Sequence, residues 1–142
     1  MATGAIIASA IPNPLISTPL ILGFHYLEDF AIHWDAGTGL SSGRKQKSTT
    51  IKHGLIDLAF GFLFVYMFFQ KDTHQLNFVA WYGAFVALIP DFLEAPKNFF
   101  TEPKFLRPFN RFHDLFHNST PNMILGLTPQ LILLFVIVIL QA

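Results

Sequence analysis

Long apolar segments separated by short polar ones form the main pattern along the chain. Three of them, at 51–69, 75–93 and 121–140, approach the length of about 20 residues that a helix needs to cross a bilayer. The segment 15–34 is a fourth and weaker candidate, because it contains ionisable side chains. Apolar and polar residues do not alternate as they do in a half-buried strand, so the pattern predicts helices throughout.

Shorter helices are expected at two other places. The first ten residues are mostly small and apolar, and Pro12 and Pro14 follow them, which predicts a short N-terminal helix that ends at the prolines. A second short helix is expected on the cytoplasmic side of the membrane. We therefore predict a single all-α domain over residues 1–142, a multi-pass transmembrane helical bundle with about four spans. The alternative is a soluble all-helical protein with an unusually apolar core.

The composition narrows the classes of partner and site. Hydrophobic residues make up 52% of the 142 residues and charged residues only 13%, which favours contact with a lipid bilayer over an ordinary soluble surface. Nine Lys and Arg balance nine Asp and Glu, so the chain lacks the basic excess that a nucleic-acid partner requires. There is no cysteine, and any metal ion must be bound by His, Asp or Glu.

The distribution of basic residues predicts the orientation in the membrane. Eight of the nine Lys and Arg lie in the connections 35–52 and 94–112, and only Lys71 lies elsewhere. Lys and Arg near helix ends accumulate on the cytoplasmic side of a membrane. We therefore expect a protein of the cytoplasmic membrane whose two long basic loops face the cytoplasm.

Ionisable side chains inside membrane spans are costly, and they usually face partners or water in the bundle interior. Three sets of them recur at intervals of four residues, which places each set on one face of a helix. These sets are His25, Asp29 and His33; His53 and Asp57; and His113 and His117. Asp91 follows Pro90 near the end of the third span. Most of these groups map to the cytoplasmic face, so a polar cavity reaching into the bundle would let them meet.

A set of histidines and carboxylates without a thiolate suits zinc or another divalent first-row ion. The pair His113 and His117 is its most metal-like part. The sets on the first two spans also have structural interpretations, as buried hydrogen-bonded pairs or as groups that orient a ligand. Glu94 and Glu102 are expected to be solvated charges.

Three segments carry a resemblance to a known family. They are TGAIIASAIPNPLISTPLILGFHYLEDFAIHWD, ALIPDFLEAP and FHDLFHNSTPNMILGLTPQ. They combine a small-residue first helix, a histidine four residues before an aspartate, a proline–aspartate pair at a helix end, and paired histidines. Together they resemble the bacterial membrane-bound metal-dependent hydrolases, the LexA-binding, inner-membrane-associated group.

The resemblance implies a set of metal ligands as well as a class of protein. The implied ligands are His25, Asp29, Asp91, His113 and His117, with His33 and Asp57 close by. The chain departs from the family pattern after Asp91, where Leu93 and Glu94 stand in place of a second aspartate.

These observations predict a membrane-bound metal-dependent hydrolase with a cytoplasm-facing His/Asp site for a divalent ion, preferably zinc. Asp29 and Asp57 would be its catalytic residues, orienting a ligand or taking a proton from water, and a lipid-borne ester or phosphoester would be its substrate. We expect Asp57 to be buried in its span with a polar partner. The alternative is a non-enzymatic membrane protein in which the same groups form a structural polar network or a structural metal site.

Overall fold

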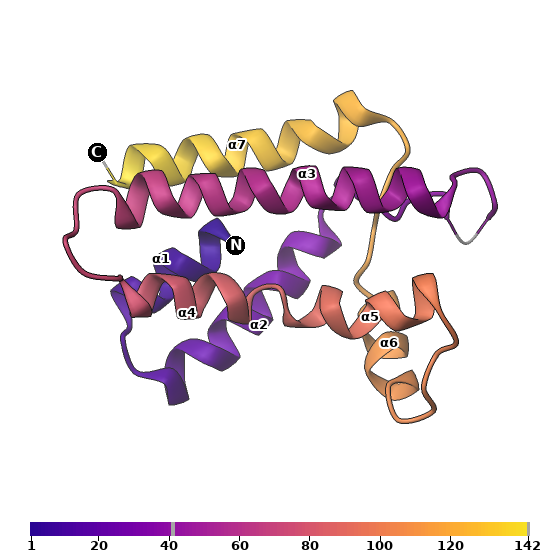
Figure 1. Ribbon diagram of the computed structural model, residues 1–142, viewed down its shortest axis with the longest axis horizontal. Helices are drawn as coiled ribbons and strands as arrows, with labels where there is room; N and C mark the ends of the chain where they lie inside the picture. The colour runs from indigo at the N-terminus through magenta and orange to yellow at the C-terminus, as the bar shows by residue number, and fades with distance from the viewer. Residues whose placement is uncertain (41, 142) are drawn as a thin grey trace.

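The computed structural model of the protein describes residues 1–40 and 42–141, and it is all-helical as predicted. Within those residues there are seven α-helices and no β-strand, and a π-helical segment, η1, continues the third helix (Figure 1). The elements are α1 (Ala2–Ala10), α2 (Pro14–Phe30), α3 (Lys47–Val65), η1 (Tyr66–Gln70), α4 (Phe78–Val86), α5 (Ile89–Phe99), α6 (Arg107–Asp114) and α7 (Met123–Gln141).

The helix starts follow local signals in the sequence. The side chain of Asn13 accepts a hydrogen bond from the backbone N–H of Leu15 at 3.0 Å, and Pro14 is the first residue of α2. Asn77 caps α4 in the same way, and its amide also donates to the carbonyl oxygen of Phe69 at 2.9 Å. The second bond ties the start of α4 to η1.

The expected span at 75–93 is not one straight helix. It is divided between α4 and α5, which are bent by 40° at the break between them. Pro90 lies in the first turn of α5, where its missing N–H is harmless, but its ring prevents the preceding turn from continuing regularly. This bend aims the start of α5 at the polar end of α2.

Small residues form the centre of the helical packing. In the interface between α1 and α4, a Cβ atom added to Gly83 would collide with the carbonyl oxygen of Gly4, so the two backbones are in direct contact. Ala5, Ala80 and Ala84 are fully buried beside them. The short first helix therefore lies inside the molecule, where it also contacts α2 and α3.

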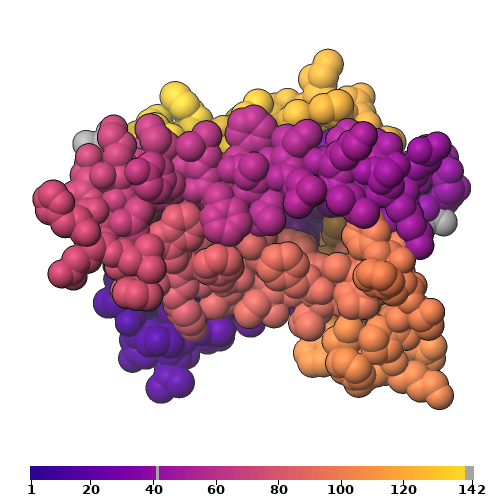
Figure 2. All heavy atoms as spheres, in the orientation of Figure 1, coloured from indigo at the N-terminus to yellow at the C-terminus, as the bar shows by residue number. Residues whose placement is uncertain are grey.

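One continuous helix of the described part, Lys47–Gln70, is long and apolar enough to cross a membrane. Only 6% of its most apolar stretch is buried, and large side chains such as Leu55 and Phe60 point outward. This helix crosses the upper half of the face shown in Figure 2, where α7 is visible above it in yellow. The bent pair α4 and α5 adds a second span if the two helices cross together, whereas Met123–Ile139 is a shorter apolar helix.

Backbone hydrogen bonds fasten the segment after α6 to the end of α2. The N–H of Asn118 donates to the carbonyl oxygen of Asp29 at 2.9 Å, and the N–H of His33 donates to the carbonyl oxygen of Asn118 at 3.2 Å. The N–H of Thr120 donates to the carbonyl oxygen of His33 at 2.9 Å, which completes a short parallel bridge between His33 and Ser119. These bonds place the histidines of the two segments next to each other.

Candidate metal centre

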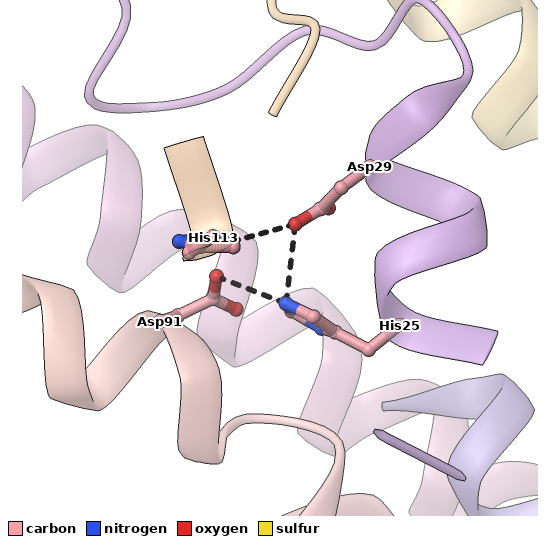
Figure 3. A group of neighbouring side chains, drawn as sticks. All are labelled: His25, Asp29, Asp91 and His113. Carbon is pink, nitrogen blue, oxygen red and sulfur yellow. Dashed lines mark hydrogen bonds and ion pairs between the residues drawn. The ribbon is translucent and has the colours of Figure 1, made fainter. Parts of the chain in front are cut away.

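Asp29 lies at the centre of a cluster of histidines. It occupies the last turn of α2, and its side chain is only 14% exposed. Its Oδ2 atom lies 2.7 Å from Nε2 of His113 and 3.2 Å from Nε2 of His25 (Figure 3). His25 is one helical turn earlier on α2, as the spacing of four residues predicted, while His113 comes from α6.

Asp91 adds a second carboxylate to this cluster. Its Oδ1 atom lies 3.7 Å from Nε2 of His25, on the opposite side of the imidazole cluster from α2 in Figure 3. Each of the four residues His25, Asp29, Asp91 and His113 offers one ligand atom, and these atoms all lie within 4.8 Å of one another. Since the side chain of Asp91 is 52% exposed, the cluster is accessible from this side.

Unpartnered nitrogens in the cluster fit a metal ion. Nε2 of His25, Nδ1 of His113 and Nδ1 of His117 are buried and have no hydrogen-bond partner of good geometry among the described residues. An unsatisfied buried polar atom costs free energy, and coordination to an ion removes that cost. Imidazole nitrogens and carboxylate oxygens in this number are the ligands that zinc takes in proteins without cysteine.

A second group of potential ligands adjoins the first. Nε2 of His33 lies 4.0 Å from Oδ1 of Asp29, and Nδ1 of His117 lies 4.0 Å from Oδ2 of the same carboxylate. The imidazole rings of His33 and His117 are 4.9 Å apart between centroids. The ligand atoms of Asp29, His33 and His117 again fall within 4.8 Å of one another.

The charges around His113 determine its protonation. Burial by itself lowers the pKa of this imidazole, but the carboxylates of Asp29 and Glu94 outweigh burial and raise the pKa to about 10. In the absence of an ion, a proton on His113 therefore holds the two carboxylates together across neutral pH. A bound cation would take over that role.

Glu94 is a member of the cluster that the sequence analysis assigned to solvent. Its side chain is only 17% exposed, and its Oε2 atom lies 3.4 Å from Nδ1 of His113. A usable signal was present in the sequence, because Glu94 follows Asp91 by three residues and thus shares its helix face. Glu94, His113 and His117 also form a third group whose ligand atoms converge.

Four of the five implied ligands therefore converge at one point, and the fifth lies beside it. His25, Asp29, Asp91 and His113 converge, whereas His117 belongs to the adjoining groups. The expectation that Asp57 is buried is wrong, because this residue is exposed on α3 and belongs to none of the convergent groups in the described part of the chain. The spacing from His53 shows that the two share a helix face, but α3 turns much of its surface outward.

A cavity of about 270 Å³ is lined in part by residues that adjoin the cluster in the sequence. It is lined by Trp34, Thr38, Gly39, Arg44, Lys45, His53, Pro121 and Met123. Trp34 directly follows the ligand candidate His33, and the ammonium group of Lys45 lies 5.2 Å from the centroid of its ring. The cavity thus combines an aromatic wall with two basic side chains.

Comparison of the chain with known protein families, curated proteins and solved structures gave no match.

Proposed function

We propose that the protein is a membrane-embedded, metal-dependent hydrolase that binds zinc through His25, Asp29, Asp91 and His113. The observation that carries this proposal is the convergence of these four side chains from three helices, together with the buried Nε2 atom of His25, which has no hydrogen-bond partner of good geometry among the described residues. A purely structural polar network would be expected to pair such atoms with each other.

The proposed chemistry divides between the ion and the side chains. A divalent ion with an open position lowers the pKa of a coordinated water, which supplies a nucleophile near neutral pH. His25 and His113 would bind the ion through Nε2, and Asp29 would bind it through Oδ2, the oxygen that lies near both of these nitrogens. Glu94 would orient His113 from Nδ1, the other nitrogen of the ring. The exposed side of Asp91 leaves an approach for the substrate.

We propose a lipid-borne phosphoester as the substrate class, in preference to a neutral ester. Arg44 and Lys45 line the cavity beside Trp34 and can pair with a phosphate group. The outward-facing apolar side chains of α3 suit a helix in contact with lipid, from which such a substrate would enter.

A multi-pass arrangement in the cytoplasmic membrane follows from the same proposal. The loops 35–52 and 94–112 hold eight of the nine basic residues and flank the metal cluster on both sides in sequence, so both face the cytoplasm. In this arrangement the cluster lies at the cytoplasmic end of the bundle, where water has access.

Zinc content and hydrolysis, measured together on protein purified in detergent, test the proposal. The variant is His113→Ala, and the matched control is His74→Ala, because His74 is an exposed histidine outside the convergent groups. The wild type and the control should retain zinc and hydrolyse bis(p-nitrophenyl) phosphate or a phospholipid in mixed micelles, and His113→Ala should lose both. A wild type without zinc would refute the site, and a zinc-loaded wild type inactive on both substrates would favour a structural metal site.

A further inference from the structure

We infer that Asp29 bridges two metal ions, the second of which is bound by His33 and His117. The inference rests on the proposed metal centre and extends it to a dinuclear site. Its basis is that two convergent groups of ligands, one with His25 and His113 and one with His33 and His117, meet at the same carboxylate.

The two oxygens of Asp29 face different histidines. Oδ2 lies closest to Nε2 of His113 and Nε2 of His25, at 2.7 and 3.2 Å, and it is 4.0 Å from Nδ1 of His117. Oδ1 faces Nε2 of His33 at 4.0 Å. A carboxylate in this position can give one oxygen to each of two ions. The third convergent group, which contains Glu94 and His117, shares only His113 with the first group. An imidazole bridges two ions far less readily than a carboxylate does, so the second ion is placed at Asp29.

The hydrogen bond of the His33 ring favours the tautomer that suits a metal ligand. Its Nδ1 atom lies 3.0 Å from the carbonyl oxygen of Ala31, and a carbonyl oxygen only accepts, so Nδ1 carries the proton and donates. The lone pair is therefore on Nε2, the atom that faces Asp29. Their separation of 4.0 Å is too long for a hydrogen bond, but it is close to the spacing of about 3.3 to 3.6 Å between two ligand atoms of a tetrahedral zinc ion.

His117 has the corresponding arrangement. Its Nδ1 atom is buried, has no hydrogen-bond partner among the residues that the structure describes, and lies 4.0 Å from Oδ2 of Asp29. Its Nε2 atom lies 3.8 Å from Oδ2 of Asp35, on the far side of the ring. A carboxylate behind a metal-binding histidine fixes the orientation of its ring and makes the ligating nitrogen more basic. With an ion bound, Asp35 would be the positioning residue of the second site, as Glu94 would be of the first.

The backbone holds the second group in place without an ion. The hydrogen bonds from Asn118 to Asp29 and between His33 and the 118–120 segment fix the two histidines on adjacent backbones. The second site therefore requires movements of side chains only. Two ions about 3.5 to 4 Å apart stabilise both the attacking and the leaving oxygen in phosphoester hydrolysis, which agrees with the proposed substrate class.

The number of ions per chain tests this inference separately from the proposed function. We would load the detergent-purified protein with Mn²⁺ alone, remove free ions, and measure both the Mn²⁺ content and the electron paramagnetic resonance spectrum. The wild type and His74→Ala should hold about two Mn²⁺ per chain and show the spectrum of a spin-coupled pair, as expected for a carboxylate-bridged site. His33→Ala should hold about one Mn²⁺ and show an uncoupled spectrum.

The possible failures have different meanings. One uncoupled Mn²⁺ in the wild type would overturn the dinuclear site and leave the mononuclear proposal intact, whereas no bound Mn²⁺ and no bound zinc would overturn both. Two ions in both the wild type and His33→Ala would overturn the role of His33. Because the stoichiometry and coupling of the wild type decide the matter, the test does not depend on the folding of the variant.

Discussion

Oδ2 of Asp29 and Nε2 of His113 lie 2.7 Å apart, although 84 residues separate them in the chain. The hydrogen bond joins the last turn of α2 to α6, and α5 contributes the carboxylate of Glu94 to the same imidazole. The junction of these three helices is therefore electrostatic, in contrast to the small-residue packing between α1 and α4.

Substitution of Glu94 should weaken metal binding without unfolding the protein. Glu94→Gln keeps the shape of the side chain but removes the charge that orients His113. We expect the affinity for zinc to fall by roughly 10- to 100-fold, the usual effect of losing a group that supports a ligand. Competition with a chromophoric chelator measures this affinity. Asp72→Asn is the matched control, since Asp72 is an exposed carboxylate in the turn after η1, and an equal loss there would contradict the assignment.

The stability of the metal-free protein should fall as the pH rises. The pKa of His113 is raised to about 10 in the folded protein, against about 6.5 for a free histidine. A raised pKa stabilises the fold fully below the unfolded value, and this contribution disappears as the pH rises through the folded value. Thermal unfolding in a chelator should therefore show a Tm that decreases between about pH 7 and pH 10.

The same measurement on His113→Gln provides the control for the pH effect. This variant should lose most of the slope over the same range, because the titrating group has been removed. Zinc-loaded wild type should not show the decrease, since metal binding strengthens as its ligands lose protons. An equal slope in the wild type and the variant would assign the effect to other groups.

Asp57→Asn should retain its metal and any hydrolytic activity. Asp57 is exposed on α3 and outside the convergent groups of the described chain, so the loss of its charge leaves the ligands unchanged. Zinc analysis and the phosphodiester assay check this directly. A loss of zinc affinity of about tenfold or more would instead show that Asp57 supports the metal ligands.

Gly83→Ala should destabilise the fold, whereas Gly23→Ala should not. A Cβ at Gly83 collides with the backbone of Gly4, and overpacking of this kind typically costs about 1 to 3 kcal/mol. A Cβ at Gly23 in α2 meets no atom of the described part of the chain within 4 Å, and alanine favours a helix by up to about 1 kcal/mol over glycine. Denaturant unfolding in detergent distinguishes the two, and equal stabilities would contradict the close contact of α1 and α4.

Cysteine labelling tests the multi-pass arrangement. The chain contains no cysteine, so Ser42→Cys, Thr101→Cys and His74→Cys each introduce a single thiol. An impermeant maleimide should label the first two from the cytoplasmic side and the third from the opposite side. Labelling of positions 42 and 101 from different sides would exclude the proposed four-span topology.

Local spacing in the sequence predicted much of the cluster. The intervals of four residues placed His25 with Asp29 and His113 near His117, and the proline before Asp91 indicated a helix end. The same reasoning failed for Asp57 and Glu94, because periodicity shows which residues share a face and not what that face contacts. For α5, the bend after α4 determines those contacts, since it brings Asp91 to His25 of α2 and Glu94 to His113 of α6.

Three consecutive residues in the segment after α2 belong to three different parts of the structure. His33 belongs to the second group of ligands, Trp34 forms a wall of the cavity, and Asp35 lies behind the ring of His117. Gly126 of α7 also packs directly on the backbone of Trp34, where any side chain would collide. A substitution that reshapes the cavity at position 34 should therefore also shift the ligand candidate His33 on one side of it and Asp35, which lies behind the ring of His117, on the other.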